Sequence, residues 1–104
     1  MKSPERGEIW IVDLGMAAKV RPALVVSVVG LDQDRSTATV VPHTTSTRGS
    51  RFEVPIPLRF LKEGAFDCQN LITVSIAKFQ KRLGMLKVEE MSLIESAIQA
   101  WLGL

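Results

Sequence analysis

Two β-branched runs in this chain end in polar side chains that can handle a phosphate. The first is Arg21-Pro22-Ala23-Leu24-Val25-Val26-Ser27, and the second is Val40-Val41-Pro42-His43-Thr44-Thr45. Apolar runs of this kind predict buried strands, whose ends hold polar side chains out into solvent. A guanidinium at one strand end and hydroxyls at another can together grip a phosphate and stabilise charge on it. If the two ends converge, they form a phosphate site that has no metal ligands and no obvious nucleophile.

The length and composition of the chain predict one cytoplasmic domain that spans residues 1–104. A chain of 104 residues suits a single compact domain. Cys68 is the only cysteine, which excludes an internal disulfide and fits a reducing compartment. The charged segment 1–7 lacks the apolar stretch of a signal peptide. No apolar run approaches the ~20 residues that a membrane span needs, so no membrane partner is expected.

Positive charge is concentrated in two parts of the chain, although the formal net charge is only +2. One group contains no acidic residue and comprises Lys78, Lys81, Arg82 and Lys87; the other comprises Arg48, Arg51 and Arg59 and is opposed only by Glu53. Such clusters predict an electrostatic footprint for RNA or another polyanion. The alternative is that these are ordinary solvated side chains.

Six strands and one helix are expected to position these groups. The residue pattern predicts strands over 8–14, 21–29, 36–42, 51–58, 66–75 and 81–86, a polar loop over 44–50, and helical turns over 60–64 and 76–79. Apolar residues at helical spacing predict one long helix that begins near Val88, includes Trp101 and stops at Gly103. This order favours a mainly β fold, a small, strongly bent antiparallel barrel with a C-terminal α-helix.

Several motifs resemble those of the MazF/PemK toxins, the toxin halves of bacterial type II toxin–antitoxin modules. The matching residues are Arg6-Gly7-Glu8-Ile9-Trp10, Asp13-Leu14, the run from Arg21, Val41-Pro42-His43-Thr44-Thr45, Phe52-Glu53-Val54, residues 69–86 and the final helix. The resemblance therefore covers nearly the whole chain. It implies an SH3-like barrel that forms a homodimer and binds a cognate antitoxin.

The resemblance also implies a metal-independent, sequence-selective endoribonuclease that acts on single-stranded RNA without a cofactor. In this family the RNA 2′-hydroxyl attacks its neighbouring phosphate and leaves 2′,3′-cyclic phosphate and 5′-hydroxyl ends. By position, the catalytic residues would be Arg21 and Thr44. The residues expected to bind RNA beside them are Lys19, Thr45, Arg48, Arg51 and Lys78. Because the RNA supplies the nucleophile, the protein has to provide orientation, charge stabilisation and proton handling.

Two departures from the family pattern leave other functions open. The loop 15–20 is short and lacks the acidic residue that often assists catalysis in the family. Ile72 and Ser75 stand where a basic and an acidic residue would be aligned. Weakened catalysis would leave an RNA- or antitoxin-binding module of the same fold. A less favoured alternative is a toxin that targets DNA gyrase, which would require an exposed Trp101, whereas the helical spacing favours a packed one.

Other residues near the motifs have both functional and structural interpretations. His43 can serve as a general base, but strand alternation turns it away from the face of Thr44 and favours a packing role. Trp10 is expected in the core or at a dimer contact, and Cys68 is expected to be a small buried apolar residue. Arg48 and Arg51 fit solvated loop residues as well as phosphate ligands.

Overall fold

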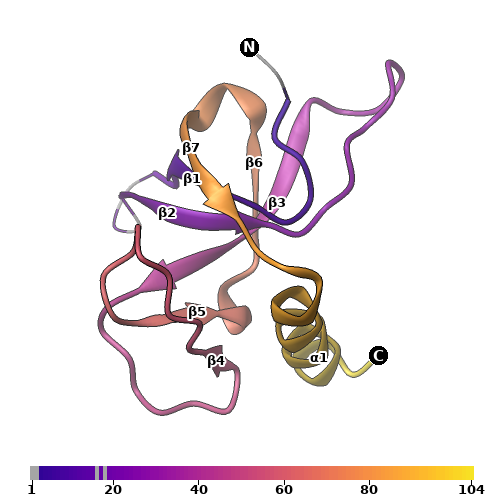
Figure 1. Cartoon of the computed structure of the whole chain (residues 1–104). Helices are drawn as coiled ribbons and strands as arrows, with labels where there is room; N and C mark the ends of the chain where they lie inside the picture. The colour runs from indigo at the N-terminus through magenta and orange to yellow at the C-terminus, as the bar shows by residue number, and fades with distance from the viewer. Residues whose placement is uncertain (1–2, 16, 18) are drawn as a thin grey trace.

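The computed structural model describes residues 3–15, 17 and 19–104. Within these residues, seven strands form one antiparallel sheet and a single α-helix follows at the C-terminus (Figure 1). The elements are β1 (Glu8–Asp13), β2 (Val20–Val25), β3 (Thr37–Thr44), β4 (Glu53–Val54), β5 (Ala65–Asp67), β6 (Ile72–Ser75), β7 (Phe79–Met85) and α1 (Val88–Leu102). The strand order is β4-β5-β3-β2-β1-β7, and β6 pairs with β3 off this path. The expected mainly β fold with a C-terminal helix is confirmed.

Strand β3 is the centre of the sheet because it pairs with three other strands. Its middle pairs with β2, where Ala23 lies opposite Pro42 and Val25 lies opposite Val40. Its first half pairs with β6, and its last two residues pair with β5. The 3-10 turn Cys68–Asn70 separates β5 from β6, so the single strand expected over 66–75 is in fact two strands.

Successive residues of the central strands alternate between two buried clusters, one on each face of the sheet. Ile9, Leu24 and Val41 belong to the cluster that includes Ile94 of α1. The other cluster contains Trp10, Val12, Leu14, Ala23, Val25, Ala38, Val40 and Phe79. Because neighbouring side chains on a strand point to opposite faces, burial of both faces requires the continuous apolar runs of the sequence. Trp10 is therefore a core residue, and Cys68 is fully buried, as expected.

Helix α1 lies next to β4 and the 3-10 turn Cys68–Asn70 (Figure 1), and its Ile94 packs in the cluster of Ile9, Leu24 and Val41. At its start, the Glu90 carboxylate accepts a hydrogen bond of 2.8 Å from the backbone amide of Lys87. At its end, Gly103 adopts the left-handed conformation with φ 72°, which confirms the predicted stop. No helix among the described residues is both long and apolar enough to span a membrane.

The prediction that Trp101 is packed is wrong, because 43% of this residue is exposed. Its ring meets Phe52 edge-on, with centroids 5.4 Å apart. The buried residues of α1 are Met91, Ile94 and Ala97. Helical spacing alone overestimated the packed face, because the sheet is contacted mainly by this narrower stripe.

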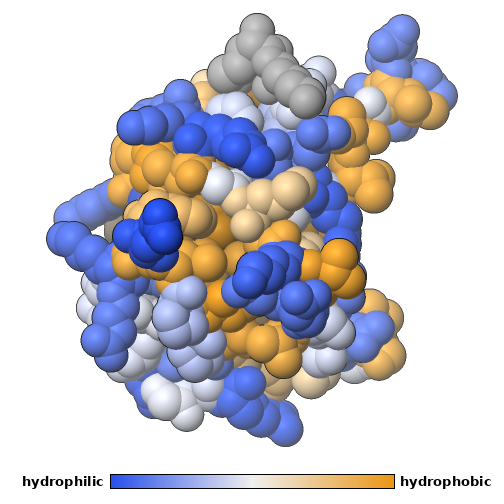
Figure 2. Space-filling view, in the orientation of Figure 1, coloured by the Kyte–Doolittle hydropathy of each residue, from blue (hydrophilic) through white to orange (hydrophobic). Residues whose placement is uncertain are grey.

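Several strand boundaries differ from those expected. β2 ends at Val25, although the Val26 amide still donates a hydrogen bond of 2.9 Å to the Thr39 carbonyl of β3; beyond this contact the chain enters a loop that projects from the body of the protein (Figure 1). Val28 and Val29 are exposed there, and Figure 2 shows hydrophobic surface on this projecting loop. β4 is only two residues long, since Pro55 and Pro57 have no N–H to donate to a sheet. Residues 60–64 form no helical turn, whereas the turn expected after β6 is present as the 3-10 turn Ile76–Lys78.

Candidate active site

The start of β2 and the end of β3 meet because the two strands are antiparallel. Ala23 lies opposite Pro42, so continuing this register by two residues leads from Ala23 to Arg21 and from Pro42 to Thr44. The side chains of Arg21 and Thr44 line one cleft of about 620 Å³. Further walls come from β1, β7 and the segment 60–62. The two polar strand ends therefore converge, which is the condition that the phosphate site suggested by the sequence requires.

Arg21 presents a guanidinium with unused donors to this cleft. Arg21 is half-buried, and its side chain makes no hydrogen bond or ion pair with any of the described residues. A guanidinium carries five N–H donors in a rigid fork that matches two phosphate oxygens. The arrangement suits the binding of an anion such as a phosphate.

Lys19 places a second cation at the same cleft. Its backbone φ is 57°, the one positive value among the described non-glycine residues. The turn is closed by two hydrogen bonds, from the Lys19 amide to the Gly15 carbonyl at 3.1 Å and from the Leu14 amide to the Lys19 carbonyl at 2.9 Å. A side chain in this region costs roughly 1–2 kcal/mol relative to the right-handed conformation. Met16 and Ala18 of the loop 15–20, which lacks an acidic residue, lie outside the described residues.

Thr44 is the last residue of β3, and its side chain is held by the loop that follows. The Thr44 hydroxyl oxygen accepts a hydrogen bond of 3.0 Å from the Ser46 amide. A hydroxyl can accept and donate at once, so its proton remains available for a phosphate oxygen. Thr45 lines the same cleft, and its side chain makes no hydrogen bond with the described residues.

His43 borders the cleft but is mainly a packing residue, because only 5% of it is exposed. Its ring meets Phe66 edge-on with centroids 5.0 Å apart, and Phe66 belongs to the core beneath α1. Burial lowers the pKa of His43, because desolvation disfavours the charged imidazolium. These contacts favour the packing role over that of a general base.

Three residues expected to bind RNA do not line this cleft. Arg48 and Arg51 are exposed in the loop between β3 and β4, where the Arg51 guanidinium lies 4.6 Å from the centre of the Phe52 ring. Lys78 closes the 3-10 turn between β6 and β7. The structure therefore places Lys19 and Thr45 in the same cleft as Arg21 and Thr44 and leaves the other three candidates outside it.

Arg82, which the sequence assigns to a basic cluster, is paired with a buried carboxylate. Glu8 accepts hydrogen bonds from the Arg82 Nε at 2.7 Å, the Trp10 Nε1 at 3.0 Å and the Glu5 amide at 2.8 Å. Burial by itself would raise the pKa of Glu8, but these hydrogen bonds and the charge of Arg82 lower it overall. The positive charge of Arg82, which the sequence counts toward the RNA-binding cluster, is therefore paired with Glu8 in the folded protein.

Sequence reasoning missed the segment 60–62, which forms a wall of the cleft. Phe60, Leu61 and Lys62 all line it, and Lys62 makes no ion pair with the described residues. One sequence signal for this wall is Gly84 of β7. A Cβ at Gly84 would lie 2.5 Å from the Phe60 ring, and a glycine within a strand marks such a close approach.

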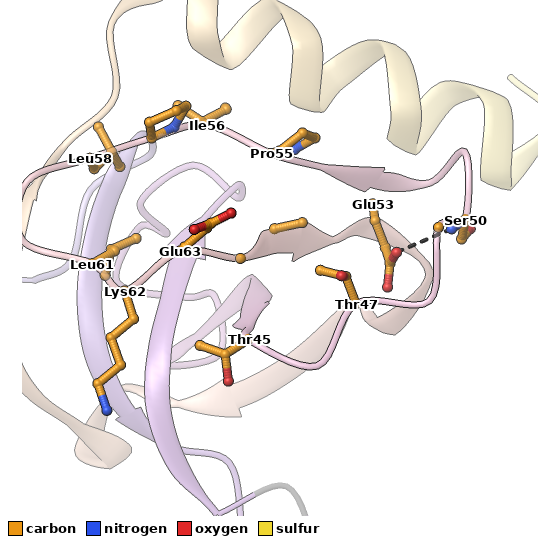
Figure 3. A pocket seen from close by; sticks show the side chains of 14 residues that line it. Thr45, Thr47, Ser50, Glu53, Pro55, Ile56, Leu58, Leu61, Lys62 and Glu63 are labelled. Carbon is orange, nitrogen blue, oxygen red and sulfur yellow. Dashed lines mark hydrogen bonds between the residues drawn. The ribbon is translucent and has the colours of Figure 1, made fainter.

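A second cleft, of about 870 Å³, adjoins the first (Figure 3). Both clefts are lined by Thr45, Leu61 and Lys62. Figure 3 shows Thr45 and Thr47 on one side of the second cleft, and Pro55, Ile56 and Leu58 on the other. A polymeric ligand bound in the first cleft can therefore continue past Lys62 into the second.

A metal ion and the Cys68 thiol are two other possible sources of chemistry in this protein. Among residues 3–15, 17 and 19–104, no group of three or more His, Cys, Asp or Glu residues could hold a metal ion. Burial, together with the charge of Asp67, raises the pKa of the Cys68 thiol to about 11. Because the thiolate is the reactive form, Cys68 is not a nucleophile near neutral pH.

Comparisons with known proteins identify what the chain is similar to. The sequence matches, over residues 5–102, the family described as PemK-like, MazF-like toxin of type II toxin–antitoxin system. An endoribonuclease in complex with its cognate antitoxin from a mycobacterial species is 25% identical, with a TM-score of 0.83 over 98% of this chain and 97% of that chain. The Mycobacterium tuberculosis toxin MazF-mt6 is 26% identical, with a TM-score of 0.79 over 93% of this chain and 97% of that chain. MazF from Deinococcus radiodurans has a TM-score of 0.84 over 100% of both chains, and at 17% identity this likeness concerns the fold alone.

Proposed function

The chain belongs to the PemK-like, MazF-like toxin family of type II toxin–antitoxin systems, and we propose that it is an endoribonuclease that cleaves single-stranded RNA. The observation that carries this proposal is the cleft shared by Arg21 and Thr44, both of which have donors available for one phosphate. The similar mycobacterial proteins described as endoribonucleases support it. A messenger RNA substrate would place its action in the cytoplasm.

The reaction that suits these groups is an internal transesterification of RNA. The 2′-oxygen forms a bond to the neighbouring phosphorus, and the bond from phosphorus to the 5′-oxygen breaks. The 2′-hydroxyl proton passes to water, and the departing 5′-oxygen takes a proton from water. The products carry a 2′,3′-cyclic phosphate and a 5′-hydroxyl. Negative charge grows on the phosphate oxygens, where the forked donors of Arg21 and the hydroxyl of Thr44 would stabilise it.

A guanidinium and a hydroxyl supply this stabilisation directly, so the proposed cleavage needs no metal ion. We also propose that the toxin acts as a homodimer and is held inactive by an antitoxin. An acidic antitoxin segment laid over the cleft would pair with Lys19, Arg21 and Lys62. The antitoxin complex of the similar mycobacterial endoribonuclease supports such a partner.

Incubation of the purified protein with a sequence-diverse single-stranded RNA in EDTA tests this function. Fragments with 2′,3′-cyclic phosphate ends are expected, and a 2′-deoxy nucleotide before the cleaved phosphate should block cleavage. Intact RNA would contradict the proposal, and fragments with 3′-hydroxyl ends would contradict the mechanism. RNA that is retained on a filter but not cut would indicate instead the binding module that the short loop 15–20 leaves open.

The exposure of Trp101 favours one second candidate, a toxin that targets DNA gyrase. Such a toxin requires an exposed tryptophan near the C-terminus, and 43% of Trp101 is exposed. A gyrase supercoiling assay with the wild type and Trp101→Ala separates the two functions. The endoribonuclease proposal expects unchanged supercoiling with both proteins, whereas inhibition that depends on Trp101 would favour the gyrase toxin.

A further inference from the structure

The loop between β3 and β4 is folded around the carboxylate of Glu53. Residues 45–52 form no strand or helix. The Arg48 amide donates to both carboxylate oxygens of Glu53, at 3.1 and 3.2 Å, and the Ser50 amide donates to Glu53 Oε1 at 3.1 Å. Figure 3 shows Glu53 pointing from β4 toward Ser50. The carboxylate thus satisfies backbone donors that have no strand partner.

Among the described residues, the other hydrogen bonds of this loop lie at its two ends. At its start, the Ser46 amide donates to the Thr44 hydroxyl. At its end, the Phe52 amide donates to Ser50 Oγ at 3.1 Å, and the Glu53 amide donates to the Ser50 carbonyl at 3.1 Å. The middle of the loop is therefore held by the Glu53 carboxylate. Hydrogen bonds to an ionised acceptor are roughly twice as strong as neutral ones, so one residue can order this segment.

The loop that Glu53 orders carries side chains that face both clefts. Thr45 lines both clefts, and Thr47 lines the second. Arg48 and Arg51 lie in the same loop and add positive charge at its exposed surface. Glu53 lines the second cleft but not the cleft of Arg21, so its carboxylate is absent from the proposed phosphate site.

We propose that Glu53 is a positioning residue that holds the loop 45–52 in the conformation that binds RNA where the chain passes from the first cleft into the second. This inference rests on the proposed function. Glu53 acts through the loop amides and does not touch the reacting phosphate. Without its charge, the loop occupies the binding conformation for only part of the time, and the apparent affinity for RNA falls by that fraction.

Limited proteolysis with trypsin measures how often this loop opens, because trypsin cuts after arginine and both Arg48 and Arg51 lie within the loop. The test variant is Glu53→Gln. The matched control is Glu89→Gln, since Glu89 is an exposed carboxylate in the first turn of α1 that lines neither cleft and makes no hydrogen bond or ion pair with the described residues. In Glu53→Gln, cutting after Arg48 and Arg51 should accelerate about tenfold while cutting elsewhere keeps its rate, because proteolysis follows the population of the open segment.

The RNA cleavage assay then separates positioning from a general structural role. Glu53→Gln should raise KM for RNA about tenfold and change kcat by less than about twofold, whereas Glu89→Gln should change neither. Glu53→Asp, which keeps the charge, should recover part of the lost affinity. Equal loop cutting or equal KM in the two glutamine variants would overturn the proposal, as would faster cutting at every site in Glu53→Gln. Intact RNA with the wild type would refute the proposed function, and the trypsin comparison would still decide whether Glu53 holds the loop.

Discussion

The backbone amide of Ser46 donates a hydrogen bond of 3.0 Å to the hydroxyl oxygen of Thr44. This contact occupies an acceptor site of the hydroxyl and leaves its proton to point elsewhere. The same side chain lines the cleft that contains Arg21, whose guanidinium has no partner among the described residues. The hydrogen bond from the loop after β3 therefore leaves the Thr44 hydroxyl able to donate to the phosphate of the proposed reaction.

Replacement of Thr44 by valine should impair catalysis strongly, because valine keeps the shape but has no hydroxyl. The loss of one donor to developing charge costs on the order of 2.7–4 kcal/mol, so kcat should fall by about 10²–10³. Thr44→Ser should retain most activity. Thr45→Val is the matched control, since Thr45 is the neighbour that lines the same cleft. A greater loss of kcat with Thr45→Val than with Thr44→Val would assign the donor to Thr45.

Lys19→Asn should weaken RNA binding without destabilising the fold. Asparagine tolerates the left-handed backbone conformation that Lys19 adopts at φ 57°, but it carries no charge. A plot of the logarithm of the RNA binding constant against the logarithm of the salt concentration should have a slope that is shallower by about 0.7. This is the change expected when one phosphate contact with a single strand is lost. Binding titrations at several salt concentrations measure this slope. Lys78→Asn, outside the cleft, provides the comparison, and an equal effect there would show that RNA contacts extend beyond the cleft.

Gly64→Ala should disturb the end of β3 that carries Thr44. A Cβ at Gly64 would collide with the Thr44 carbonyl oxygen, so the two backbones would have to separate. Overpacking of this kind costs about 1–3 kcal/mol, and RNA cleavage should fall with it. Gly30→Ala is the control, because its Cβ would meet the Asp34 side chain at 3.1 Å on an exposed loop. Urea unfolding curves that are equal for the two variants would contradict the close approach of Gly64 to Thr44.

The Glu8–Arg82 pair should make stability depend on acid pH. Because the pKa of Glu8 is lowered in the fold, its carboxylate stabilises the protein fully above the pKa of an unfolded glutamate, about 4.3. This contribution is lost as the pH falls through the lower pKa of the folded protein. Glu8→Gln should therefore cost about 1–3 kcal/mol near pH 7, and the difference from the wild type should shrink in acid. Urea unfolding of both proteins from neutral to acid pH measures this difference in the free energy of unfolding. A difference that grows in acid would contradict the stabilising role of the Glu8 carboxylate.

Much of the fold could be predicted because local signals and tertiary packing agree. The apolar runs around Leu24 and Val41 are buried on both faces, and the stop at Gly103 follows from its left-handed conformation. The prediction of strands and packed residues failed where contacts with the rest of the protein, and not the local sequence, determine the structure. Val28 has strong strand propensity but has left the sheet, and Trp101 fits the helical spacing but lies beyond the packed stripe.

The site was predictable to the extent that antiparallel pairing joins the strand ends of Arg21 and Thr44. The segment 60–62 could not be placed in the same way, because an irregular connection has no periodicity that locates it in space. Arg82 shows a further limit. Its charge counts toward a basic cluster in the sequence, but only the folded chain brings it to Glu8.

The central claim, that Arg21 acts on a phosphate in the cleft it shares with Thr44, is tested most directly by cleavage of single-stranded RNA by Arg21→Ala in EDTA. Arg35→Ala is the matched control, because Arg35 precedes β3 at the opposite end of that strand from Thr44 and is exposed. The account predicts that the Arg21 variant loses about 10²–10³ in kcat, as for a group that stabilises developing charge, while the Arg35 variant keeps wild-type activity. Undiminished cleavage by Arg21→Ala would contradict it.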